Sequence, residues 1–357
     1  MTPLARARAF SRRYGTAAPI MLAPMAGASA PSLSIAVSQA GGLGACGALL
    51  FSPDQIARWA AAVRAGTPGP FQINLWVPDP PPQRETKAEA AQRAFLSRFG
   101  PEPPASAGDA APPDFAAQFD ALVEARPAIA SSVMGLFPPS LAERLRQVGI
   151  DWWATATTLA EARAAADAGA QAIVAQGMEA GGHRGSFDAS RAERDLVGLT
   201  ALVPAVVDAT GLPVIAAGGV ADGRGLAAAL ALGASAVQVG TAFLRSPEAQ
   251  LPPAWADGLA RAAPEATALT RAFSGRAGRA LATDYVRAAA DPGAPAPAPY
   301  PVQRGLTATM RAVAGDAGDL QRMQAWAGQS AALARAEPAG EIVQRMWREA
   351  RSLLGEE

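Results

Sequence analysis

Eight short apolar runs, separated by alanine-rich stretches of helical character, limit the folds that this chain can adopt. They occupy residues 19–25, 43–49, 71–77, 128–134, 152–157, 172–177, 213–219 and 236–242. Strands that are apolar along their whole length are typical of a parallel sheet with both faces covered by helices. Eight such strands alternating with helices predict an α/β fold of the (β/α)8 barrel type rather than an open doubly wound sheet.

The composition supports one large folded domain with a smaller companion. The chain has 357 residues, of which 50% are hydrophobic and 17% charged, which is enough for a sizeable core. Lys+Arg and Asp+Glu number 31 each, so we expect neither nucleic acid nor a membrane surface as a partner. With one cysteine and one histidine, the chain has no internal disulfide, and we expect no metal site.

The sequence also bears on where the protein is found. No apolar run is long enough to span a bilayer, and the four arginines among residues 6–13 adjoin no apolar segment of signal-peptide length. The lone Cys46 suits a reducing compartment. We therefore expect a cytoplasmic protein, either a monomer or a homodimer.

Two segments interrupt the alternation of strands and helices. Residues 78–113 are rich in proline, alanine and charge, and we interpret them as an excursion after the third strand with one short helix. The second interruption follows the eighth strand. The expected domains are a barrel over residues 1–245, a smaller and mainly helical lid or substrate domain over 246–334, and a C-terminal helix within 335–357 that returns to the barrel.

The loop after the sixth apolar run is the most distinctive polar segment of the chain. Residues 176–185 read Gln-Gly-Met-Glu-Ala-Gly-Gly-His-Arg-Gly and include His183, the only histidine. Glycine pairs allow a ligand to approach the backbone closely. In a (β/α)8 barrel, loops at the carboxyl ends of strands build the active site, so this loop is a candidate site.

Two later strand ends predict an anion site. Gly218 and Gly219 follow the seventh run, and Gly240 and Thr241 follow the eighth. Free main-chain N–H groups there, together with the start of the next helix, favour a bound anion. Because phosphate commonly binds at the seventh and eighth loops of such barrels, the two pairs together predict a phosphate group.

Two earlier strand ends are ambiguous from the residues alone. Met25 follows Ala23 and Pro24 at the end of the first run, and Asn74 lies within the third. A methionine there either fills the core or borders a flat ring. A buried asparagine needs a partner, which is either a neighbouring loop or a ligand.

Taken together, these segments resemble the nitronate monooxygenase family, formerly called 2-nitropropane dioxygenases. The similarity extends over residues 19–243 and more loosely to the C-terminus. The resemblance implies an FMN-bearing barrel with a small helical lid, acting on a small-molecule substrate and O2. It implies that the following residues lie at the flavin: Ala23, Pro24, Met25, Asn74, Gln176, Gly181, Gly182, Gly218, Gly219, Gln238, Gly240 and Thr241. It also suggests a substrate pocket near Ser274, Arg276 and Tyr300, with Arg276 a possible anion clamp or a surface residue.

One position departs from the pattern of the family's first class. There the fourth strand ends in Ser-Phe-His-Phe-Gly with a catalytic histidine, whereas this chain has Val133 in its place. A neutral nitroalkane must lose a proton to a base, while an alkyl nitronate is already an anion. His183 is therefore a candidate substitute acid or base, or else it fixes the glycine loop.

Three functions remain open on the sequence. The first is an FMN-dependent monooxygenase acting on alkyl nitronates or a similar small carbanion-like substrate. The second is an FMN-dependent NAD(P)H:quinone or enoyl reductase. The third is a flavin-binding protein with little turnover.

Overall fold

The main sheet of the molecule closes into a barrel. The computed structural model describes residues 1–356. Its eight parallel strands lie in the order β1-β9-β8-β6-β5-β4-β3-β2, and a bridge between Met21 and Leu43 joins the first to the last. The strands are β1 (Ile20–Leu22), β2 (Gly44–Gly47), β3 (Phe71–Trp76), β4 (Ile129–Val133), β5 (Asp151–Ala156), β6 (Ala172–Gln176), β8 (Val214–Ala217) and β9 (Ala236–Val239). Each coincides with one of the eight predicted runs, and only β5 extends beyond its run, by one residue at Asp151.

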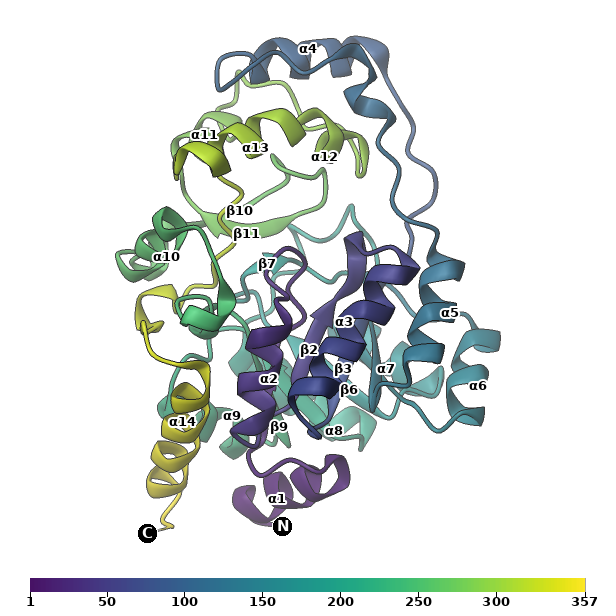
Figure 1. Ribbon diagram of the computed structural model, residues 1–357, viewed down its shortest axis with the longest axis vertical. Coiled ribbons are helices and arrows are strands. Elements are labelled where there is room, and N and C mark those ends of the chain that lie inside the picture. Colours follow the sequence, from purple (N-terminus) through teal and green to yellow (C-terminus); the bar gives the residue numbers. More distant parts are fainter. Residues whose placement is uncertain (357) are drawn as a thin grey trace.

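Helices surround this barrel (Figure 1). They are α2 (Pro31–Gln39), α3 (Pro53–Gly66), α5 (Phe115–Ala125), α6 (Pro139–Gln147), α7 (Leu159–Asp167), α8 (Leu199–Thr210), α9 (Gly223–Ala231) and α14 (Ala339–Leu353). The last is the predicted C-terminal helix. It packs between α9 and α2 and so completes the ring, although a whole domain separates it from β9.

Successive side chains along each strand point alternately out of and into the barrel, so the core consists of an outer cluster under the helices and an inner cluster inside the barrel. In β6, Ile173 and Ala175 pack outward under the helices, while Val174 points into the barrel. The amino-terminal end of the interior is closed by α1 (Pro3–Tyr14), whose Phe10 and Tyr14 join the inner cluster. The carboxyl end of the barrel is left for polar side chains and a ligand.

The smaller domain lies above the carboxyl ends of the barrel strands (Figure 1). Its helices are α10 (Pro253–Ala260), α11 (Asp284–Ala289), α12 (Val302–Leu306) and α13 (Ala308–Ala317). It also contains an antiparallel sheet of β10 (Thr267–Thr270), β11 (Gly278–Leu281) and β7 (Gly182–His183), which the sequence did not predict. Because β7 belongs to the histidine loop of the barrel, this sheet connects the two parts.

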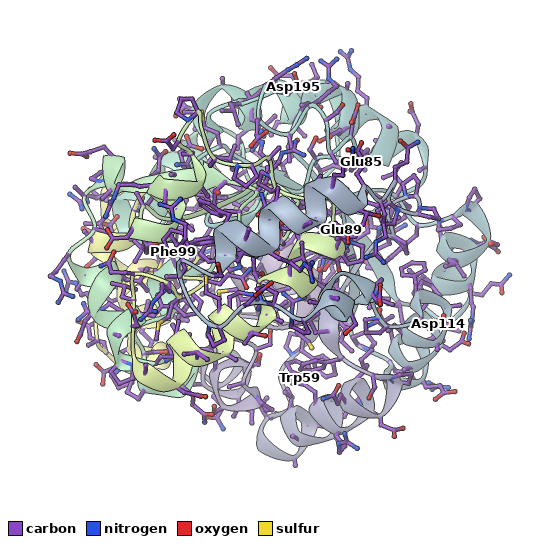
Figure 2. The ribbon with its side chains drawn as sticks, turned by 90° about the horizontal axis from the view of Figure 1, so that it is seen from above. Trp59, Glu85, Glu89, Phe99, Asp114 and Asp195 are labelled. Carbon is purple, nitrogen blue, oxygen red and sulfur yellow. The ribbon has the colours of Figure 1, made fainter. Side chains whose placement is uncertain are left out.

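The proline-rich excursion packs against the smaller domain. It contains α4 (Thr86–Leu96) and a 3-10 turn, η2 (Ala105–Asp109). Figure 2 shows α4 crossing over the smaller domain between the labelled Glu85 and Phe99. Phe95 and Leu96 share an apolar cluster with residues of α11 and α12. The excursion therefore leaves the barrel and contributes to the core of its neighbour.

None of the helices within residues 1–356 combines the length and the apolar character that a membrane crossing requires.

Candidate active site

A cavity of about 310 Å³ opens at the carboxyl ends of the barrel strands. Residues from the strand ends form its floor and walls, and residues of the smaller domain cover it. Every residue that the family resemblance placed at a flavin lines it: Ala23, Pro24, Met25, Asn74, Gln176, Gly181, Gly182, Gly218, Gly219, Gln238, Gly240 and Thr241. His183 and Val133 line it as well. The fold thus brings together residues from six separate barrel strands and the loops that follow them.

Glycines form one side of this cavity because no larger residue fits there. A Cβ atom at position 181 would collide with the backbone of Ala327 and Gly328, and one at 240 would lie 3.1 Å from Met25 Sδ. Gly218 and Gly219 have φ angles of 111° and 69°, which L side chains rarely adopt. We call Gly218, Gly219, Gly240 and Thr241 the glycine cradle.

The main-chain N–H groups of the glycine cradle are not used in hydrogen bonds within the described residues. Within residues 1–356, none of its four main-chain N–H groups donates to a protein acceptor. Such a cluster of donors is suited to an anion. Thr241 Oγ1 accepts a hydrogen bond from Gly328 N at 3.1 Å, so the last part of the smaller domain holds this side of the cavity in place.

The helix that follows Gly219 does not contribute free donors, contrary to expectation. Asp222 caps α9 and accepts from Arg224 N at 3.0 Å and Gly225 N at 3.2 Å. Gly223 N donates to the Glu349 carboxylate of α14 at 3.1 Å. Two carboxylates therefore accept from the first N–H groups of α9, so the free main-chain donors on this side of the cavity are those of the preceding loop.

A polar network holds the floor of the cavity. Asn74 Nδ2 donates to Ser131 O at 3.1 Å and to Ser131 Oγ at 3.0 Å. The Ser131 hydroxyl donates to Gln72 Oε1 at 2.9 Å, and Gln72 Nε2 donates to Gln238 Oε1 at 3.3 Å. These bonds settle the ambiguity at Asn74: it has a protein partner and also lines the cavity.

Gln176 braces the histidine loop. Its Nε2 donates to the His183 carbonyl at 3.1 Å, and its Oε1 accepts from Gly185 N at 2.8 Å. Both ends of the amide are thus engaged with the loop. Gln176 lines the cavity while fixing the backbone on which His183 is carried.

His183 is held on three sides. Its Nε2 lies 2.7 Å from Ser274 Oγ, and its ring packs between Trp76 and Trp326, with centroid distances of 4.9 and 4.8 Å. Burial, followed by the charges of Arg304 and Arg276, lowers the pKa of His183 to about 3. The imidazole is therefore neutral near pH 7. It can hydrogen-bond to a ligand but is too weak a base to remove a proton from a carbon acid readily.

Of the expected substrate-pocket residues, Val133 lines the cavity and the other three lie behind its wall. Ser274 is buried behind His183. Arg276 is buried beside Trp76 and forms an ion pair with Asp79, with Nε 2.9 Å from Oδ2. Because its charge is neutralised there, Arg276 does not act as an anion clamp. Tyr300 stacks on Trp76 and lines an adjoining cavity of about 300 Å³.

The sequence did not identify two arginines of the smaller domain that line the main cavity, Arg304 and Arg311. Arg311 donates to Thr307 Oγ1, Gln324 Oε1 and the Arg304 carbonyl at 3.1, 3.2 and 2.9 Å. The only available signal was spacing. Arg304 is four residues after Tyr300, a spacing that would suggest neighbours on a helix, but α12 begins only at Val302 and so does not include Tyr300.

With the cavity defined, comparison with known proteins assigns the family. A family model described as nitronate monooxygenase matches residues 9–349. The chain belongs to the nitronate monooxygenase family. The nitronate monooxygenase of Paraburkholderia phytofirmans is 40% identical over 98% of this chain and 96% of the relative. That of Pseudomonas aeruginosa is 39% identical over 96% of this chain and 99% of the relative.

Solved structures agree with membership of the nitronate monooxygenase family. Nitroalkane oxidase from Streptomyces ansochromogenes superposes with a TM-score of 0.87 and 36% identity, covering 97% of this chain and 100% of the other. FabK from Thermotoga maritima superposes with a TM-score of 0.75 and 28% identity, covering 96% of each chain. The predicted family and barrel fold are confirmed, and the protein is an enzyme of the oxidoreductase class.

Proposed function

We propose that the protein is an FMN-dependent monooxygenase that oxidises alkyl nitronates with O2. The observation that carries the proposal is the cavity itself, in which the glycine cradle and the neutral His183 face one enclosed space. The name of its two sequence relatives, nitronate monooxygenase, supports this substrate, and the structural neighbour nitroalkane oxidase is named for the corresponding neutral acids.

The residues of the cavity fit FMN. The glycine cradle offers main-chain donors for a phosphate. Met25, Asn74 and Gln238 line the adjoining part of the cavity, where an apolar surface and amide groups suit a flavin ring. When bound, FMN would accept electrons from the nitronate carbon and pass them to O2.

The protein side chains favour an anionic substrate over its neutral acid. Val133 cannot accept a proton, and the depressed pKa of His183 makes it a poor base. A nitronate needs no deprotonation, whereas a neutral nitroalkane does. Trp76 and Trp326 pack on both sides of His183 and keep bulk water from that side of the cavity.

Flavin binding can be tested through Gly181. In Gly181→Ala, the new methyl group displaces the backbone of Ala327 and Gly328, and we expect the purified variant to lose most of its FMN. The matched control is Gly315→Ala, because Gly315 lies in α13 with no atom within 4 Å of its Cβ position. That change should keep full FMN content and raise the unfolding free energy by about 0.5–1 kcal/mol. Equal FMN content in both variants would place the flavin elsewhere.

The reaction can be tested by anaerobic stopped-flow absorbance of the FMN-loaded protein. It is mixed separately with propyl-2-nitronate and with NADPH. We expect the nitronate to bleach the flavin band and NADPH to leave it unchanged. Bleaching by NADPH alone would make the protein a reductase. No bleaching by either would indicate a flavin-binding protein with little turnover.

A further inference from the structure

The charge in the main cavity is unbalanced. Arg304 and Arg311 both line it, and no aspartate or glutamate within residues 1–356 does. Two like charges brought close together destabilise each other. Their proximity is evident in the pKa of Arg311, which burial and the charge of Arg304 lower to about 10. An anion in the cavity would relieve this repulsion.

The two arginines differ in how they are held. The Arg311 guanidinium donates hydrogen bonds to Thr307, Gln324 and the carbonyl of Arg304. The guanidinium of Arg304 has no hydrogen bond and no ion pair in the part of the chain that the structure describes, although it is half-buried. Arg276 shows how this fold neutralises a buried arginine, since Asp79 pairs with it. Arg304 has no such carboxylate.

Arg304 lies away from the glycine cradle. Tyr300, four residues before it, stacks on Trp76 at the end of β3. In the closed strand order, β3 is four strands from β8 in either direction, so Trp76 and Gly218 are on opposite walls. Arg304 and His183 line the same cavity, and the charge of Arg304 contributes to the lowered pKa of His183. A phosphate in the glycine cradle would therefore leave Arg304 available to a second ligand.

We propose that Arg304 binds the negatively charged oxygens of the substrate and makes the enzyme select the nitronate anion over the neutral nitroalkane. The inference rests on the proposed function. A guanidinium presents paired N–H donors that match two oxygens on one planar centre. A nitro group has the same two oxygens but no net charge, so its bond to Arg304 is weaker. Arg304 is thus a specificity-determining residue, separate from the flavin cradle.

Steady-state kinetics of Arg304→Gln test the selectivity. We expect kcat/KM for propyl-2-nitronate to fall about 10- to 100-fold, mainly through KM, while kcat/KM for 2-nitropropane changes little. Arg304→Lys should recover part of the loss because it restores the charge without the paired donors. The control is Arg261→Gln, which removes an exposed positive charge of the smaller domain. An equal loss on both substrates in Arg304→Gln would overturn the proposal.

A binding measurement separates this inference from the proposed function. Nitrate, a planar anion of similar shape, is titrated into the FMN-loaded protein at constant ionic strength and followed by tryptophan fluorescence. We expect the nitrate affinity of Arg304→Gln to fall about tenfold or more, with FMN content and melting temperature unchanged. If the wild type binds nitrate through Arg304 but oxidises no nitronate, the proposed function fails and the anion site stands. Equal nitrate affinity in both proteins would refute the anion site.

Discussion

His183 is the only histidine of the chain, and the fold gives it surroundings that oppose protonation. Two tryptophan rings enclose it, and Arg304 and Arg276 add positive potential. An imidazole that stays neutral at pH 7 serves as a hydrogen-bonding group beside the substrate. It does not replace the base that is missing at Val133, in keeping with the proposed preference for a nitronate anion.

The neutral state of His183 predicts a pH-dependent stability. The pKa of His183 is about 3 in the folded chain and about 6.5 when unfolded. As pH falls below that unfolded value, only the unfolded state gains the proton, so stability decreases until pH approaches 3. The unfolding free energy of wild type minus that of His183→Asn should decline from pH 7 to 4.5, with a slope approaching about 1.4 kcal/mol per pH unit.

This difference isolates one group, because the other titrating residues are common to both proteins. Urea titrations at matched pH values provide the measurement. A difference that stays flat with pH would mean that the pKa of His183 is not depressed.

At the scale of elements, α9 shows that a helix start beside a ligand site need not serve the ligand. Asp222 and Glu349 occupy its first N–H groups. The carboxylates also offset the positive end of the helix dipole. The N–H groups of the glycine cradle before the helix have no protein acceptor within residues 1–356, so the cradle and not α9 has donors for the proposed phosphate.

The variant Asp222→Ala tests whether the start of α9 contributes to helix stability and not to cofactor binding. Loss of the N-cap should cost about 0.5–2 kcal/mol of unfolding free energy, while the dissociation constant for FMN stays near that of the wild type. Asp222→Asn is the control, since asparagine retains the capping oxygen and most of the stability. Weaker FMN binding in proportion to the lost stability would show that α9 takes part in the cofactor site.

On the scale of the whole molecule, the excursion after β3 and the smaller domain form one folded unit over the cavity. Gln92 of α4 donates to the carbonyls of Pro295 and Ala296 at 2.6 and 2.8 Å. Leu96 is fully buried among residues of the smaller domain. The segment that carries Arg304 is therefore stabilised by a helix more than 200 positions earlier in the chain.

Truncation of Leu96 should loosen this unit and spare the barrel. Leu96→Ala is expected to cost about 2–5 kcal/mol locally. Amide hydrogen exchange should accelerate over residues 272–310 and stay slow in the barrel strands. Leu122→Ala, in the barrel helix α5 and equally buried, should give the opposite pattern. Faster exchange everywhere in Leu96→Ala would mean that the two parts unfold together.

The sequence by itself determined the features that depend on neighbouring residues. Apolar runs located all eight barrel strands, because a strand buried on both faces leaves a local signature. Glycine pairs located the cradle, because closely spaced glycines are visible in the sequence itself.

Only the tertiary structure decided which charges are paired and which face the ligand. Arg276 and Asp79 are 197 residues apart, and no local pattern distinguishes that neutralised arginine from Arg304, which has no ion pair among residues 1–356. The three-stranded sheet likewise joins β7 to strands far along the chain. Burial and long-range partners set the electrostatic state of a side chain. Residue types can therefore predict where a site lies, but the role of each group within the site depends on the long-range contacts that the fold creates.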